Sequence, residues 1–354
     1  MIKLNIVINL ILNFWLTHIS FFIVSMRKKG DYMKTLEKLV SLLLSAIMVF
    51  CLIACSSGKT TSASSAGSEE KVYKIGTLQL VQHQALDSSY QGFVDYLNEK
   101  GIKFTMDFQN ASGEQSACET IAEKFQNDNL DLCYAIATPA AQSVVAHLDG
   151  TPIVASAITD PAASGLCKSN QNPGGTLTAA SDLTPVDAQF DLLVELLPNA
   201  KNVGILYCSA EANSKIQANM ALDSAKKRGL NATEYTVVNS NDIQTVVESM
   251  VGLVDVIYVP TDNVLAAGFD TVATLCIDNK IPTIVGEESM VDKGGLATYG
   301  INYYSLGKIA GSLAERILVK GENPGSIPVA YLDAASCERK INTDTAKALG
   351  IEVK

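Results

Sequence analysis

Polar residues follow directly after the predicted strands of this chain, and two kinds of group among them could bind a small charged molecule. Thr138 stands before Pro139 at the predicted start of a helix, where the first backbone amides are free to bind an anion such as a carboxylate. A bound ammonium would instead need a partly desolvated carboxylate. Four acidic residues are the candidate partners: Asp182, Asp262, Glu287 and Glu288.

Structural roles are the alternative for each of these residues. Thr138 could only cap its helix, and the carboxylates that contact no ligand would be caps, hinge groups or solvated charges. Asp160 precedes a proline, so we favour a turn at that position. His83 is a further candidate contact, but a lone histidine more often has a structural or surface role.

The residues needed for catalysis are poorly represented. The sequence contains no GxSxG elbow, no P-loop, no HExxH helix and no glycine fingerprint for a dinucleotide. Glu287 and Glu288 could imitate a paired carboxylate, but neighbouring residues on a strand point to opposite faces. We therefore expect a binding protein rather than an enzyme, with no cofactor and no metal.

Short β-branched runs alternate with helix-length amphipathic segments from Val72 onward, which predicts parallel sheets with crossover helices. The predicted strands span 72–80, 103–109, 130–137, 152–158 and 175–181, and then 202–208, 232–238, 254–260, 282–287 and 295–301. The predicted helices span 86–100, 114–127, 139–148, 185–197, 212–228, 241–252 and 263–279. Ligands of such sheets bind beyond the carboxyl ends of the strands.

The two halves of this pattern also resemble each other in sequence. Asp131 to Tyr134 aligns with Asp255 to Tyr258, and Pro152 to Leu166 aligns without a gap with Pro282 to Leu296. Either an internal repeat or turn chemistry shared by two parallel-sheet lobes explains these matches. In both cases the chain is predicted to form two similar α/β lobes with a cleft between them.

The N-terminal region has the features of an export signal. Lys34 and Lys38 precede an uncharged run from Leu39 to Ile53, which is too short to span a bilayer comfortably. The small residue before Cys55, with a leucine three positions before it, matches the lipobox of bacterial lipoproteins. This match implies cleavage before Cys55 and a lipid on its thiol, followed by a flexible Ser-rich tether to residue 71.

A second apolar stretch, Ile6 to Val24, precedes this signal. We expect translation to begin at Met33, with an additional membrane-spanning helix as the alternative. The whole chain has a formal net charge of −10, which makes nucleic acid an improbable partner. Its six cysteines beyond Cys55 are scattered, without CxxC pairs, so we expect small core residues rather than a zinc site or a disulfide scaffold.

Several blocks of the sequence resemble one known family. These blocks include KIGTLQLVQHQALDSSYQGF, FQNASGEQSACETIAEKF, AIATPAAQ, ITDPAASGL, SDLTP, LLPNAKNVGILY, CSAEANS, YVPTDN and ATYGINYYSLGK. They are similar to the substrate-binding lipoproteins of ABC transporters, in the branch associated with aromatic amino acids such as tryptophan and tyrosine. The resemblance extends from Lys71 to Lys354.

The resemblance implies a type I periplasmic-binding-protein fold, with two Rossmann-like lobes joined by a three-stranded hinge. The chain would cross between lobes near Ser181, Asn302 and Val329. The N-terminal lobe would comprise 72–181 and 302–328, and the C-terminal lobe 182–301 and 329–354. The helix from Tyr303 to Val319 would pack on the first lobe. The implied ligand pocket consists of Gln79, His83, Thr138, Ala140, Asp182, Ser209, Asn213, Asp262 and Glu287.

The implied function is to bind an amino acid, with an aromatic one as the family expectation, and to deliver it to an ABC permease and its ATPase by lobe closure. The protein would be a monomer, extracytoplasmic and lipid-anchored to the bacterial cell membrane. The alternative is a sensory lipoprotein that presents its closed form to a membrane receptor.

Overall fold

The computed structural model describes residues 71–332 and 337–353, which belong to one compact unit. The predicted export signal, the start at Met33, Cys55 and the tether lie outside the described residues. Within the described ranges, no helix is long and apolar enough to cross a membrane.

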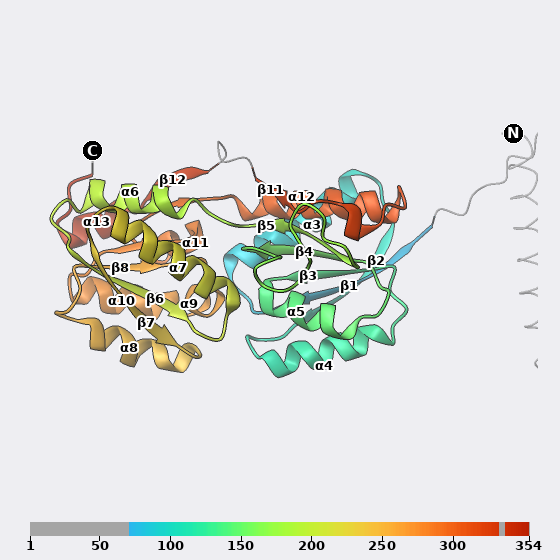
Figure 1. The fold of residues 1–354 in the computed structure, drawn as a ribbon, viewed down its shortest axis with the longest axis horizontal. Helices are drawn as coiled ribbons and strands as arrows, with labels where there is room; N and C mark the ends of the chain where they lie inside the picture. Colours follow the sequence, from blue (N-terminus) through green and yellow to red (C-terminus); the bar gives the residue numbers. More distant parts are fainter. Residues whose placement is uncertain (1–70, 333–336, 354) are drawn as a thin grey trace, which may run out of the picture. The chain divides into compact units, whose positions relative to one another are not determined.

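The first sheet has six parallel strands in the spatial order β11-β5-β4-β3-β1-β2 (Figure 1). Its central strands are apolar over their whole length, as expected for a sheet covered on both faces, and every residue of β3 and β4 is buried. The strand bounds are β1 (Tyr73–Gln79), β2 (Phe104–Asn110), β3 (Leu132–Ile136), β4 (Ile153–Ile158), β5 (Leu177–Ser181) and β11 (Ala330–Tyr331).

Helices cover both faces of this sheet. They are α3 (Gln84–Glu99), α4 (Gln115–Gln126), α5 (Thr138–His147) and α12 (Tyr303–Leu318), with a short 3-10 helix, η2 (Pro324–Ser326). Helix α12 packs along α3. Glycines permit this close approach, because a Cβ at Gly92 would lie 2.0 Å from the backbone oxygen of Tyr304, and a Cβ at Gly307 would lie 2.0 Å from that of Ser89.

The second sheet has the order β12-β10-β9-β8-β6-β7, in which only β12 is antiparallel to its neighbour among the described strands. The strand bounds are β6 (Asn202–Cys208), β7 (Asn231–Val237), β8 (Val256–Val259), β9 (Thr283–Val285), β10 (Ala297–Gly300) and β12 (Glu338–Ile341). Its helical elements are α6 (Val186–Leu196), α7 (Ala212–Lys227), η1 (Ser240–Asp242), α8 (Ile243–Met250), α9 (Asn263–Ala267), α10 (Phe269–Asp278), α11 (Glu288–Asp292) and α13 (Thr343–Leu349).

The chain passes between the sheets three times. The first crossing follows β5 at Ser181, and the second lies between β10 and α12 at Asn302. Strand β11 pairs in parallel with β5, so the third crossing follows Tyr331 rather than lying near Val329. This is the two-lobed α/β architecture with a three-stranded hinge that the resemblance implied.

The predicted helix over 263–279 is instead two helices. Helix α9 ends at Ala267 and α10 begins at Phe269, with Gly268 between them. A Cβ at Gly268 would lie 2.6 Å from Cδ1 of Ile243, so glycine lets this junction pack on α8. The predicted strand over 282–287 is shorter, because Glu287 leaves the sheet to begin α11.

Matching residues support both sheets. Oδ2 of Asp131 accepts a hydrogen bond from the Lys74 amide at 2.8 Å, and Oδ2 of Asp255 accepts one from the Asn202 amide at the same distance. In each lobe a helix phenylalanine packs against a buried strand tyrosine, Phe93 against Tyr134 and Phe190 against Tyr258. The aligned residues of the two halves thus have the same structural roles.

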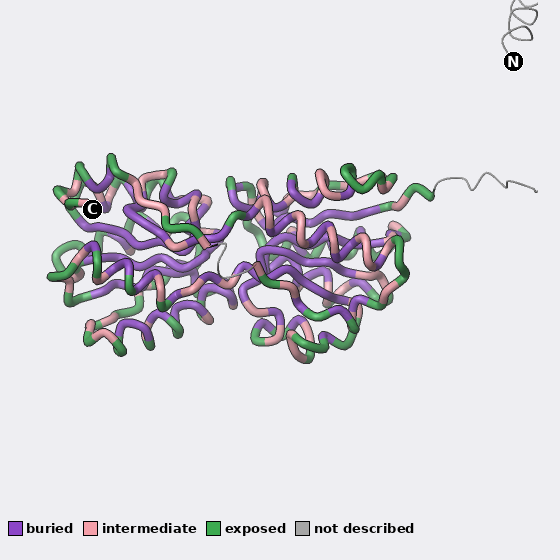
Figure 2. Tube along the Cα trace, turned by 90° about the horizontal axis from the view of Figure 1, so that it is seen from above, coloured by how far each residue is buried: buried purple, intermediate pink, exposed green. Residues whose placement is uncertain are grey.

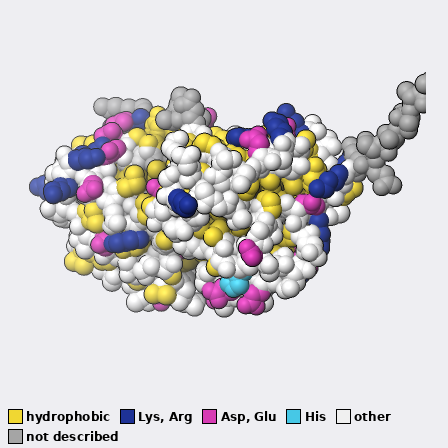
Figure 3. All heavy atoms as spheres, turned by 45° about the vertical axis from the view of Figure 1, so that its right-hand side comes forward, with side chains coloured by type: hydrophobic (Ala, Val, Ile, Leu, Met, Phe, Trp, Pro, Cys, Tyr) yellow, Lys and Arg dark blue, Asp and Glu magenta, His cyan; other side chains and the backbone are white. Residues whose placement is uncertain are grey.

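Burial follows the layered architecture. The strands lie at the buried centre of each lobe, and the outer faces of the helices are exposed (Figure 2). Four of the free cysteines are buried, as expected for small core residues: Cys118, Cys133, Cys208 and Cys276. On the face seen in Figure 3, acidic and basic side chains are interspersed, consistent with surface ion pairs such as Arg228 with Asp191.

Candidate ligand-binding site

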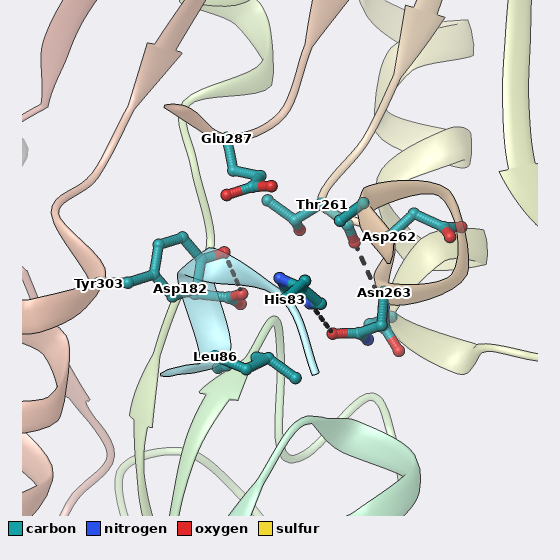
Figure 4. A pocket seen from close by; sticks show the side chains of 11 residues that line it. His83, Leu86, Asp182, Thr261, Asp262, Asn263, Glu287 and Tyr303 are labelled. Atoms are coloured by element: carbon teal, nitrogen blue, oxygen red, sulfur yellow. Dashed lines mark hydrogen bonds between the residues drawn. The ribbon is translucent and has the colours of Figure 1, made fainter. Parts of the chain in front are cut away.

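A small polar cavity of about 10 Å³ lies between the two lobes (Figure 4). Elements of both sheets contribute to it at the carboxyl ends of their strands, where parallel sheets bind ligands. Its lining residues are His83, Leu86, Ala157, Asp182, Asn213, Thr261, Asp262, Asn263, Ala266, Glu287 and Tyr303. A cavity of this size has room for about one water, so an amino acid could enter only after the lining residues separate.

His83 connects the first lobe to the second across this cavity. It precedes α3 at the N-cap position and is buried. Its Nε2 lies 3.4 Å from Oδ1 of Asn263, and its Nδ1 has no hydrogen-bond partner among the described residues. Burial lowers the pKa of His83 to about 4, so the imidazole is neutral at pH 7.

Asp182 and Tyr303 belong to two different hinge crossings and meet at the cavity. The hydroxyl of Tyr303 donates to Oδ2 of Asp182 at 2.8 Å, and the Thr159 hydroxyl donates to Oδ1 at 3.3 Å. Gln217 of α7 extends this network into the second lobe, because its Nε2 donates to the Thr159 hydroxyl at 2.9 Å. Burial raises the pKa of Asp182 to about 6.

Glu211 orients two amide side chains of the second lobe. Its Oε2 accepts hydrogen bonds from Nδ2 of Asn213 at 2.9 Å and from Nδ2 of Asn263 at 2.6 Å. With the amide groups held in this way, Oδ1 of Asn213 is buried without a partner among the described residues. Burial, with Asp262 nearby, raises the pKa of Glu211 to about 7.

Asp262 has a structural role in addition to its place in the cavity lining. It is the N-cap of α9, where Oδ1 accepts from the Leu265 amide at 2.8 Å, and its Oδ2 accepts from the Cys208 amide at 2.6 Å. Burial raises the pKa of Asp262 above the ordinary range of an aspartate. The carboxyl group therefore joins the ends of β6 and β8.

Glu287 is the N-cap of α11 and also lines the cavity. Its Oε2 accepts from the Ser289 amide at 3.3 Å, and burial raises its pKa to about 7. Figure 4 shows its carboxyl group directed toward Asp182 and Tyr303. Three buried carboxyl groups, those of Asp182, Asp262 and Glu287, thus line the cavity.

Five of the nine predicted pocket residues lie together in this lining: His83, Asp182, Asn213, Asp262 and Glu287. The other four do not line it. Gln79 is buried and donates to Oδ1 of Asp87 at 2.7 Å, Ala140 is buried within α5, and Ser209 is exposed with its hydroxyl on the Val237 carbonyl. Thr138 is also fully buried.

Thr138 does not cap α5. Ala137 occupies the N-cap position with a φ of 85°, and the Thr138 hydroxyl has no hydrogen-bond partner among the described residues. The alternative that Thr138 acts only as a helix cap is therefore wrong. Asp160 does shape a turn, because its Oδ1 accepts from the Ala163 amide at 3.0 Å.

The predicted pocket did not include six of the cavity residues: Leu86, Ala157, Thr261, Asn263, Ala266 and Tyr303. Tyr303 begins a helix that follows the second hinge crossing, and its position beside Asp182 depends on where the two sheets sit in three dimensions. The one signal in the sequence was its place directly after the predicted crossing at Asn302.

Within the described residues, no group of three or more His, Cys, Asp or Glu could hold a metal ion.

Two α/β lobes with a polar cavity at their junction are suited to binding a small solute, and comparison with known families specifies the kind of protein. The chain belongs to the ABC transporter substrate-binding protein family, whose model matches residues 74–354. Members of this family are extracytoplasmic binding proteins rather than enzymes.

Relatives of the chain include a tyrosine-binding protein of Clostridioides difficile, which is 39% identical over 324 residues, 89% of this chain and 93% of that protein. A Streptococcus pneumonia ABC domain solved in complex with L-Trp is 37% identical, with a TM-score of 0.78 over 80% of this chain and 96% of that chain. The ligand-free, open structure of a Clostridium difficile substrate binding protein with adhesive properties is 39% identical, with a TM-score of 0.62 over the same shares.

Proposed function

We propose that this protein captures an aromatic amino acid in the cavity between its lobes and delivers it to the permease and ATPase of an ABC importer. The observation that carries the proposal is the cavity itself, which combines buried carboxyl groups with unpaired polar atoms of His83 and Asn213. An amino acid offers hydrogen-bond donors and acceptors to both kinds of group. The relatives named for tyrosine or solved with L-Trp support the aromatic class.

Lobe closure is the proposed response to the ligand. Hydrogen bonds from His83 to Asn263 and from Gln217 to Thr159 connect the lobes directly. The likeness is also higher to the L-Trp complex than to the ligand-free, open structure, although the sequence identities are similar. We interpret the described arrangement as a closed one, whose lobes would separate to admit the ligand and then join around it in the form that the permease recognises.

The proposed ligand contacts are His83, Asp182, Asn213, Asp262 and Glu287, with Tyr303 and Asn263 added by their place in the lining. Residues 72–181 with 302–331 form the proposed first lobe, and 182–301 with 338–353 form the second. Cys55 is the proposed site of lipid attachment on the outer side of the bacterial cell membrane. Replacing Cys55 by serine would then release the protein from membranes, which cell fractionation would detect.

Thermal unfolding of the purified protein in the presence of each of the twenty amino acids tests the ligand assignment. A ligand at a hundred times its Kd adds about 2.7 kcal/mol to the free energy of unfolding, so tryptophan, tyrosine or phenylalanine should raise the Tm clearly. Asn213→Ala should abolish the shift, and Ser209→Ala, an exposed residue outside the lining, should preserve it. A folded protein that none of the three aromatic amino acids stabilises would contradict the proposal.

A further inference from the structure

The cavity holds two buried carboxyl groups that have no cationic partner. Asp182 enters from the first hinge crossing, and Glu287 enters from the start of α11. Among the described residues, no lysine or arginine forms an ion pair with either group. Lys293, whose charge acts on Glu287, instead donates to the Ala266 carbonyl at 2.7 Å.

Two further side chains point to a ligand at this place. Asn213 and His83 are more than nine-tenths buried and line the same cavity, and each has an unpaired polar atom among the described residues. The free atom of Asn213 is Oδ1, which can only accept a hydrogen bond. Two carboxyl groups and an amide oxygen form a set of acceptors that matches an ammonium group.

The remaining groups around Glu287 do not neutralise it. His83 and Tyr303 face it from the first lobe, and neither is positively charged at pH 7. Asp182 acts on Glu287 with the same sign of charge, Asp262 lines the same cavity, and Lys293 acts on Glu287 without forming an ion pair with it. Two adjacent buried carboxyl groups without a cation favour holding a proton.

We infer that Asp182 and Glu287 together form the ammonium site, that they hold a proton when no ligand is bound, and that ligand binding releases this proton to solvent. In the exchange, a protonated carboxyl group loses its proton to water and becomes a carboxylate that pairs with the R–NH₃⁺ group of the ligand. The inference rests on the proposed function. It adds which residues bind the ammonium group, and it adds that ligand affinity depends on pH. The raised pKa values, about 6 for Asp182 and about 7 for Glu287, agree with this geometry.

Calorimetric titration of the purified protein with L-tryptophan tests the inference. Repeating the titration in buffers of different ionisation enthalpy measures the protons exchanged, and we expect about 0.5 to 1 proton released per ligand near pH 6.5. Because protons compete with the ammonium, the affinity should fall by up to about tenfold per pH unit below pH 6.

A ligand without the ammonium group and variants of single carboxyl groups test which groups cause the proton release. Indole-3-propionate, which lacks the ammonium, should bind at least about a hundredfold more weakly at pH 7.5 and without proton release. Glu287→Gln should weaken tryptophan binding and reduce the protons released. Glu195→Gln removes an exposed carboxylate of the same lobe, paired with Arg339, and should change neither quantity.

The outcomes separate this inference from the proposed function. Tryptophan binding that is independent of pH between 5.5 and 7.5, with no proton release, would overturn the inference and leave the proposed function intact. Proton release that persists unchanged in both Glu287→Gln and Asp182→Asn would also overturn it. Failure of tryptophan, tyrosine and phenylalanine to bind the folded protein at any pH would overturn both.

Discussion

The two lobes have matching contacts within their sheets, but they differ where the strands end at the cavity. Asp131 and Asp255 accept the same backbone hydrogen bond at 2.8 Å, and Tyr134 and Tyr258 occupy matching buried positions. At the cavity the similarity ends. In the second lobe the cavity residues Asp262 and Glu287 cap short helices, whereas in the first lobe the cavity residue His83 stands at the N-cap position of α3 without a side-chain cap bond.

This difference shows how the same architecture provides two kinds of surface. The second lobe fixes its polar atoms through internal hydrogen bonds, such as those that Glu211 accepts from Asn213 and Asn263. The first lobe leaves more polar atoms unpaired, including His83 Nδ1 and the Thr138 hydroxyl. The second lobe thus satisfies its polar groups internally more completely than the first, and loops at strand ends can diverge in this way while the sheets stay constant.

Removal of the Asp262 carboxylate should have the largest effect on stability. Asp262→Ala leaves the amides of Cys208 and Leu265 buried without acceptors, so we expect a loss of about 3 kcal/mol in the free energy of unfolding, measured by urea denaturation. Thr138→Val in the first lobe replaces a hydroxyl without a partner by a methyl group of similar size and should cost under about 1 kcal/mol. Equal losses in the two variants would contradict the difference between the lobes.

The pH dependence of stability should show the lobes acting in opposite directions. The pKa of Glu287 is raised to about 7 by burial, so the folded state binds more protons than the unfolded state, and its contribution falls by about 1–3 kcal/mol as pH rises from 4.5 to 7. The pKa of His83 is lowered to about 4, so the folded state binds fewer protons, and its contribution rises between pH 4 and 6.5.

Urea unfolding without ligand, from pH 4.5 to 7.5, would separate these contributions. Glu287→Gln should make the stability less dependent on pH, because it removes part of the fall. His83→Gln should steepen the fall with rising pH, because it removes the opposing contribution. Identical slopes in both variants and the unaltered protein would show that neither group titrates as its burial implies.

The smallest expected effect distinguishes the two core tyrosines. Tyr134→Phe leaves the hydroxyls of Ser89 and Ser156 bonded to each other at 2.8 Å, so about 0.5 kcal/mol should be lost. Tyr258→Phe removes the donor that serves Oε1 of Gln189 at 2.7 Å, and about 1–2 kcal/mol should be lost. Thermal unfolding of both variants would test the ranking, and a larger loss for Tyr134→Phe would reverse it.

The alternation of strands and helices was sufficient to predict the two lobes, because each parallel strand requires a crossover. The ends of helices and strands were predicted less well, because contacts in the folded structure decide where an element begins or ends. Gly268 ends α9 because the chain must pass close to Ile243, and Glu287 leaves the sheet because it caps α11. The contact between Gly268 and Ile243 joins residues far apart in sequence, and the five-residue helix α11 is too short to show a helical period, so periodicity alone could reveal neither boundary.

Ligands of parallel sheets bind beyond the carboxyl ends of the strands. This rule predicted the cavity residues of the second lobe better than those of the first lobe. Asn213, Asp262 and Glu287 each stand at or near a helix start directly after a strand, so the sequence predicts their position. Gln79 and Thr138 satisfy the same rule but are buried outside the lining. Tyr303 required knowledge of how α12 returns to the first lobe, which is a property of the complete fold.

The return of α12 and β11 to the first sheet has a consequence for the order of folding. A chain that leaves the cell in an extended form emerges with its N-terminal end first, but the first lobe lacks α12 and one edge strand until residues up to Tyr331 have emerged. The second lobe in turn waits for β12 and α13. Neither sheet can therefore be completed until the residues close to the C-terminal end of the chain are available.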